Sequence, residues 1–153
     1  MAATSLRKHL IDAGAKLLAA LDDAGLQAQG AAWVFDHGLG DWRYVIVTSL
    51  VDTMGRSKVY RQLLTVIRKL DTPKDLTVAD IHLVSPGAHL FKAIARIVNV
   101  DIPGGGFATF QNCAISDAKF DAVIFRWIVR VPTQAEAAKI EKQFKRRVKE
   151  LTE

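Results

Sequence analysis

Basic side chains gather around one short turn near the middle of the chain. Residues 52–58, Asp-Thr-Met-Gly-Arg-Ser-Lys, join an apolar segment to a helical apolar repeat over residues 59–70 that contains no acidic residue. A helix N-terminus exposes backbone N–H groups and carries a partial positive charge, to which Arg56 and Lys58 add full charges. This combination favours a phosphate or a carboxylate, although the glycine spacing does not match that of a nucleotide phosphate-binding loop.

A second helix start is expected at a later strand–helix junction. Ser85 at the N-cap and Pro86 at the first helical position follow a short apolar strand over residues 81–84. If this strand is parallel to the one over residues 42–51, both helices begin at one edge of the sheet, where ligands of open α/β sheets bind. The candidate anion site then comprises Arg56, Ser57, Lys58, Ser85, Gly87 and His89.

Acidic residues support an alternative function. Asp36, His37 and Asp41 surround a predicted hairpin turn, and Asp52 follows the next strand. Carboxylates and imidazole act in general acid–base catalysis and bind metals, so a small metal-dependent hydrolase or nuclease is the alternative. Their spacing matches no metal-site pattern, and such residues are also common in turns. We therefore predict no metal and no cofactor, and the sequence favours a binding protein over an enzyme.

Three other features have ordinary structural explanations. His82 alternates with apolar residues and is expected at the edge of the core. Cys113 is the single cysteine, so it forms no intrachain disulfide and is expected to pack as a small apolar residue. The run Gly104–Gly106 leads into a strand, so it is interpreted as a loop.

Composition predicts one globular domain over residues 1–153, with 50% hydrophobic and 24% charged residues. The net charge is +5 and the pI is about 9.5, which favours an anionic partner: nucleic acid, a phosphorylated molecule or an acidic protein surface. We expect no membrane association, because no apolar run approaches a span of roughly 18 residues. Asp12 and Lys16 interrupt the first apolar stretch, so a signal peptide is not expected and the predicted location is cytoplasmic.

The last helix is also strongly basic. Thr133 and Glu136 form a predicted capping box, and apolar residues then recur at helical spacing. Its other face carries the following basic residues: Lys139, Lys142, Lys145, Arg146, Arg147 and Lys149. This face could bind nucleic acid or an acidic partner. Acids at helical spacing, such as Glu141 before Lys145, are equally typical of a solvated face.

The predicted elements follow the order αββαβαββα. They indicate an α+β (α/β-like) fold, with a mixed five-stranded sheet and four helices. The strands over residues 31–36 and 42–51 should form a hairpin, and the latter should pair in parallel with residues 81–84 through a right-handed crossover. In the strand over residues 120–131, Trp127 should share a buried face with Val123, Phe125, Val129 and Val131. The opposite face should be partly solvated or should form a homo-oligomer; it holds Ala122, Ile124, Arg126, Ile128 and Arg130.

Overall fold

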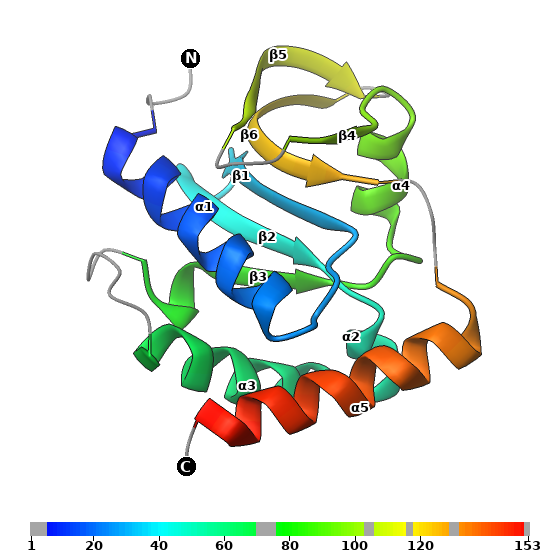
Figure 1. The fold of residues 1–153 in the computed structure, drawn as a ribbon. Coiled ribbons are helices and arrows are strands. Elements are labelled where there is room, and N and C mark those ends of the chain that lie inside the picture. Colours follow the sequence, from blue (N-terminus) through cyan, green and yellow to red (C-terminus); the bar gives the residue numbers. More distant parts are fainter. Residues whose placement is uncertain (1–5, 70–75, 103–105, 116–117, 129–131, 152–153) are drawn as a thin grey trace.

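The computed structural model describes residues 6–69, 76–102, 106–115, 118–128 and 132–151 and shows a mixed sheet with helices on both faces (Figure 1). Its elements are α1 (Lys8–Asp23), β1 (Gly30–Asp36), β2 (Asp41–Val47), α2 (Leu50–Thr53), α3 (Arg56–Lys69), the 3-10 turn η1 (Val78–Asp80), β3 (Ile81–Val84), α4 (His89–Ala95), β4 (Val100–Asp101), β5 (Ala108–Ile115), β6 (Ala118–Trp127) and α5 (Gln134–Leu151). The predicted α+β class is therefore confirmed.

The sheet has the strand order β3-β2-β1-β6-β4, and β5 also pairs with β6. β1 and β2 form the predicted antiparallel hairpin. β2 and β3 are parallel neighbours, with Tyr44 opposite Ile81 and Val47 opposite Val84, as predicted for strands joined by a helical crossover. β4 and β5 each pair with β6 in antiparallel fashion.

Apolar residues form a separate core on each face of the sheet. On one face, α1, α3 and α5 cover Trp33, Tyr44 and Phe125. On the other face, α4 covers Ile124 and Trp127. Because both faces are covered, the central strands β1 and β2 are apolar at consecutive positions rather than at alternate ones.

A β-bulge in β6 overturns the predicted face of Trp127. Ala31 pairs with Arg126 and Ala32 pairs with Ile124, so Phe125 is an extra residue opposite β1. Beyond the bulge the side chains change faces, and Trp127 lies with Ile124 under α4 rather than with Phe125. The prediction that Trp127 is buried is correct, since its exposed fraction is 0%.

The other face of β6 also differs from the expectation. Ala122 and Ile124 are fully buried beneath α4, so they are neither solvated nor available to a second copy. The bulge directs Arg126 toward Asp22 at the end of α1. Val129, Arg130 and Val131 lie outside the described residues.

Several predicted boundaries are wrong for local reasons. The second strand ends at Val47, and a short helix, α2, follows where the strand was expected to continue. Ser85 does not begin a helix: its Oγ accepts a hydrogen bond from Gly87 N at 3.1 Å, forming a turn, and α4 starts at His89. The two-residue β4 is a sixth strand that has no sequence pattern of its own.

The start signal predicted for the last helix is confirmed. Thr133 N donates to Glu136 Oε1, and Glu136 N donates to Thr133 Oγ1, which is the predicted capping box of α5. Gly25 follows the end of α1 with a φ of 83°, the conformation that favours glycine after a helix. The first helix was expected to have its N-cap at Thr4 or Ser5, but α1 begins at Lys8 with Arg7 at its N-cap.

Candidate functional site

The predicted anion site lies where β2 and β3 end, and Arg56 has a structural contact there. Its Nε donates a hydrogen bond to the carbonyl oxygen of Leu83 at 3.1 Å. Tyr60 OH donates to Ile81 O at 2.9 Å and accepts from Leu83 N at 3.3 Å. These α3 side chains therefore satisfy backbone groups of the edge strand β3, which would otherwise be open to pairing.

Ser85 and Gly87 form the other half of this predicted site. Ser85 Oγ donates to the Asp52 carboxylate at 2.7 Å while it accepts from Gly87 N. The acidic side chain of Asp52 therefore lies at this edge of the sheet, where the prediction placed only basic and polar groups. The neighbouring residues Ser57, Lys58 and His89 are exposed. Anion binding at this edge of the sheet stays a prediction.

The residues of the alternative hydrolase site have separate contacts. Asp36 Oδ1 accepts from Gly38 N and Leu39 N within the hairpin turn, which is a local turn-forming role. His37 Nε2 lies 3.5 Å from the buried Asp121 carboxylate. Asp41 is the first residue of β2, whereas Asp52 lies past the other end of that strand, in α2. Among the described residues, no group of three or more His, Cys, Asp or Glu side chains is arranged to hold a metal ion.

His82 is exposed on the edge strand β3, between the buried Ile81 and Leu83, rather than at the edge of the core as expected; its imidazole favours the neutral form. Partial burial, followed by the charges of Arg43 and Arg56, lowers the pKa of His82 below its ordinary value, while Asp36 opposes this effect. Cys113 lies in β5, opposite Phe120 in the strand register. The Gly104–Gly106 segment falls largely outside the described residues.

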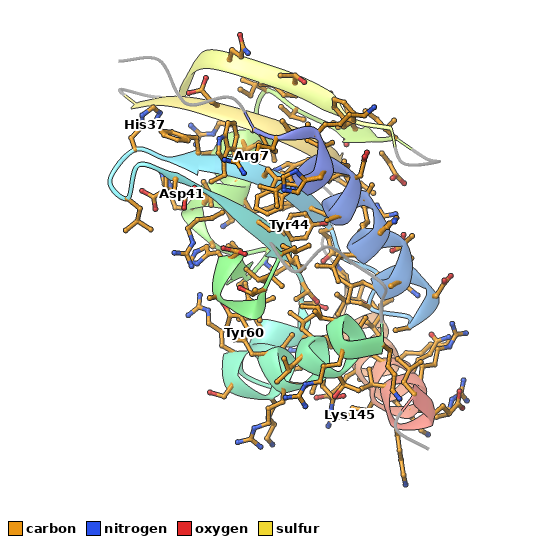
Figure 2. The ribbon with its side chains drawn as sticks, turned by 90° about the vertical axis from the view of Figure 1, so that its left-hand side faces the viewer. Arg7, His37, Asp41, Tyr44, Tyr60 and Lys145 are labelled. Atoms are coloured by element: carbon orange, nitrogen blue, oxygen red, sulfur yellow. The ribbon has the colours of Figure 1, made fainter. Side chains whose placement is uncertain are left out.

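The strongest concentration of positive charge lies on two helices that pack together. α3 and α5 lie side by side and begin at the same end of the pair (Figure 1). Both helices bury an apolar stripe in the shared core and leave the opposite side exposed, as Figure 2 shows beneath the sheet. Arg56, whose Nε is bonded to Leu83 O, is left aside. We call the other exposed basic side chains of the two helices the basic face: Lys58, Arg61, Arg68 and Lys69 on α3, with Lys139, Lys142, Lys145, Arg146 and Lys149 on α5.

Few acidic groups offset this charge. α3 contains no acidic residue. On α5, Glu141 pairs with Lys145 at 3.6 Å, and the exposed Glu150 lies with Lys69 and Arg146 around one hollow. Arg147 is only partly exposed, so it is not counted in the basic face; its Nη1 donates to the Asp23 carbonyl oxygen at the C-terminus of α1. Sequence patterns showed the basic side of each helix separately. The packing of α3 against α5 is what joins them into one surface.

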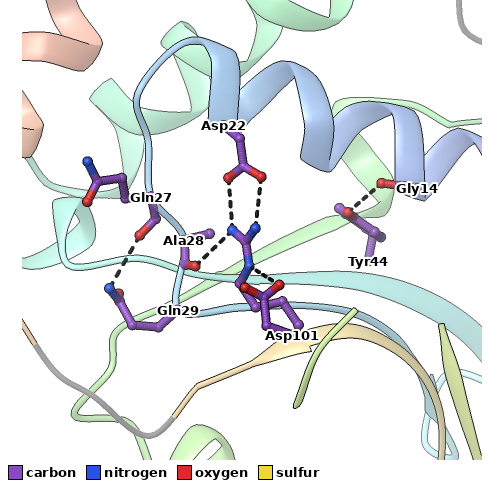
Figure 3. Close-up of polar contacts among 8 residues, drawn as sticks. Gly14, Asp22, Gln27, Ala28, Gln29, Tyr44 and Asp101 are labelled. Carbon is purple, nitrogen blue, oxygen red and sulfur yellow. Dashed lines mark hydrogen bonds and ion pairs between the residues drawn. The ribbon is translucent and has the colours of Figure 1, made fainter. Parts of the chain in front are cut away.

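Sequence reasoning missed a second polar cluster, centred on Arg126 (Figure 3). Arg126 Nη1 and Nη2 each donate to an Asp22 carboxylate oxygen at 2.8 Å, and Nε donates to Asp101 at 3.0 Å. The bond to Asp22 is the main cause that raises the pKa of Arg126, and burial opposes it. A cavity of about 360 Å³ adjoins this cluster and is also lined by Gln29 and Glu136. The Arg126–Asp22 pair spans distant parts of the chain, so no local motif indicates it.

Comparison with known proteins assigns no family to this chain. No family model matches the sequence, and no curated protein and no solved structure matches it. Of the helices in the described residues, none has the length and apolar character needed to cross a membrane. The functional argument therefore depends on the geometry of this chain alone.

Proposed function

We propose that this protein is a non-enzymatic module that binds the phosphate backbone of double-stranded nucleic acid through its basic face. The observation that carries the proposal is the side-by-side packing of α3 and α5, which combines two basic helix surfaces into one. Lysine and arginine side chains that neutralise phosphates release counterions, which supplies most of the affinity in sequence-independent binding.

The layout of the charges suits an extended polyanion better than a small phosphorylated molecule. A compact anion requires cations that converge on one point. Here they are spread along α3, which is roughly 21 Å long, and α5, which is roughly 27 Å long, at 1.5 Å per residue. Lys139, Lys142, Arg146 and Lys149 recur every three or four residues, so they form one row along α5.

The positions of the aromatic residues favour a duplex over a single strand. Single-stranded nucleic acids bind largely by stacking bases on exposed aromatic rings. Six large aromatic rings are fully buried: Trp33, Trp127, Tyr44, Phe91, Phe125 and Phe144. The partly buried Trp42 is on β2 and the exposed Phe107 directly precedes β5, so neither ring belongs to α3 or α5. Tyr60, on α3, has its hydroxyl bound to the backbone of β3. A surface that offers cations without stacking rings fits a paired backbone.

A charge-reversal comparison tests this proposal. Fluorescence anisotropy would measure the affinity of the full chain for a DNA duplex of about two helical turns, at roughly 50 mM salt. In the test variant, Arg61→Glu on α3 is combined with Arg146→Glu on α5. In the matched control, Lys92→Glu is combined with Arg96→Glu at α4, which covers the opposite face of the sheet.

Both variants change the net charge equally, so their difference isolates the basic face. We expect the test variant to lose at least about tenfold in affinity, and the control to stay within about twofold of the wild type. A single-stranded oligonucleotide of the same length should bind more weakly than the duplex. Equal losses in the two variants, or tighter binding of the single strand, would contradict the proposal.

A further inference from the structure

We infer that the cavity beside Arg126 is a separate binding site for a small aliphatic amine. It lies where the end of α1, the segment before β1, the end of β6 and the start of α5 meet, on residues that the basic face does not use. Its volume of about 360 Å³ falls in the range of small-molecule pockets. The inference is independent of the proposed binding of nucleic acid.

The charges around the cavity favour a cation. Asp22, Asp101 and Glu136 line it together with a single basic residue, Arg126. The Arg126 guanidinium already donates to both carboxylates and to the carbonyl oxygen of Ala28, so its hydrogen-bonding capacity is largely used. The side chains of Asp22 and Asp101 remain 38% and 52% exposed, so they stay accessible to a ligand.

A buried amide oxygen is the second, independent indication of a ligand. Gln29 lines the cavity and is only 9% exposed. Its Nε2 donates to the carbonyl oxygen of Gln27 at 3.3 Å (Figure 3). Its Oε1 has no hydrogen-bond partner within the described part of the chain. A buried acceptor without a donor is costly, so the contents of the cavity are expected to supply one.

The rest of the cavity lining is apolar and indicates the character of the uncharged part of the ligand. Ile128, Pro132 and Ile140 contribute apolar surface to the cavity. Carboxylate and amide oxygens only accept hydrogen bonds, so the complementary molecule carries N–H donors, a positive charge and a short hydrocarbon chain. A divalent metal ion fits less well, because it needs several oxygen ligands to itself, and Arg126 already donates to both Asp22 oxygens and to one Asp101 oxygen. An N–H donor needs only one of the lone pairs that these carboxylates retain.

Calorimetric titration of the full chain without nucleic acid tests the inference. The probes are 1,5-diaminopentane, the uncharged 1,5-pentanediol and magnesium chloride. We expect the diamine alone to bind and to raise the melting temperature by mass action. No binding of the diamine, or equal responses to the diol or to magnesium, would overturn the inference. Because no duplex is present, this result is separate from the test of the basic face.

Three variants locate the site. Gln29→Leu removes the unpaired oxygen together with the hydrogen bond from Nε2 to Gln27 O, and it should weaken diamine binding at least about tenfold. Glu136→Gln removes a charge but keeps the capping box, and it should weaken binding about threefold or more. Glu150→Gln, elsewhere on α5, should leave it unchanged. If Gln29→Leu fails to fold, the test is the comparison of diamine affinity between Glu136→Gln and Glu150→Gln. Equal affinities of these two variants would overturn the inference.

Discussion

Gly14→Ala in α1 is predicted to destabilise the fold, although helix propensity alone predicts the opposite. Replacing a glycine inside a helix with alanine normally stabilises it by about 1 kcal/mol. Gly14, however, lies at the closest approach of α1 to the sheet, where the hydroxyl of Tyr44 donates to its carbonyl oxygen at 2.8 Å. Burial raises the pKa of that hydroxyl, with a smaller contribution from Asp22, while Arg126 lowers it.

The size of the effect follows from the space at Gly14. An added Cβ would lie 2.7 Å from Trp33 Nε1, 2.9 Å from Tyr44 Cε2 and 3.0 Å from Phe125 Cε2. These rings are fully buried or nearly so, and Trp33 also donates to Leu10 O, so they have little room to move. Overpacking of this kind costs about 3 kcal/mol at the upper end of its range. After the gain in propensity, the net loss is about 2 kcal/mol.

Urea unfolding followed by circular dichroism measures this free energy. The exposed Ala19→Gly in the same helix is the calibration, and it should lower the stability by about 1 kcal/mol. For a chain of this size, the Gly14→Ala loss corresponds to a melting temperature lower by roughly 4–8 °C. A Gly14→Ala variant as stable as the wild type, or more stable, would refute the close approach of α1 to the sheet.

Three further substitutions test separate contacts. Trp127→Ala should cost about 3–5 kcal/mol in urea unfolding, because Trp127 is fully buried and donates to the Phe91 carbonyl oxygen at 3.2 Å. Tyr60→Phe should cost about 1 kcal/mol in the same assay, because its hydroxyl joins α3 to the edge of β3. His82 has a lowered pKa in the folded state, so the unfolded chain binds more protons and stability falls as the pH drops below about 6.5. Melting temperatures measured across this pH range should decrease less on acidification for His82→Gln than for the wild type.

Each of these expectations can fail in a distinct way. A Trp127→Ala loss below about 1 kcal/mol would place that side chain outside the core under α4. Unchanged stability of Tyr60→Phe would mean that its hydroxyl does not satisfy the backbone of β3. Parallel pH profiles for the wild type and His82→Gln would contradict the lowered pKa.

Local patterns were sufficient to predict most of the fold. The hairpin of β1 and β2 and the parallel pairing of β2 with β3 follow from apolar runs, turn residues and the right-handedness of crossovers. The capping box at Thr133 also acts within a few residues. Such signals depend on neighbours along the chain, so they can be recognised without knowledge of the tertiary structure.

The remaining features depend on contacts between distant segments. Strict alternation along β6 placed Trp127 with Phe125, and nothing local to the strand reveals the bulge that separates them. Asp22 and Arg126 meet across a large part of the chain. The basic face needs the packing of α3 against α5, whereas the charge pattern of either helix alone is also typical of an ordinary solvated surface.

The salt dependence of duplex binding tests the central claim most directly. The measurement is the slope of log K against log salt concentration between about 50 and 200 mM. If roughly four cations of the basic face contact phosphates, the slope is about −3.6, because each contact contributes about −0.9. Arg146→Ala should make the slope shallower by about one, while Lys92→Ala should leave it unchanged. A wild-type slope near zero, or identical slopes for the two variants, would contradict the binding of nucleic acid by the basic face.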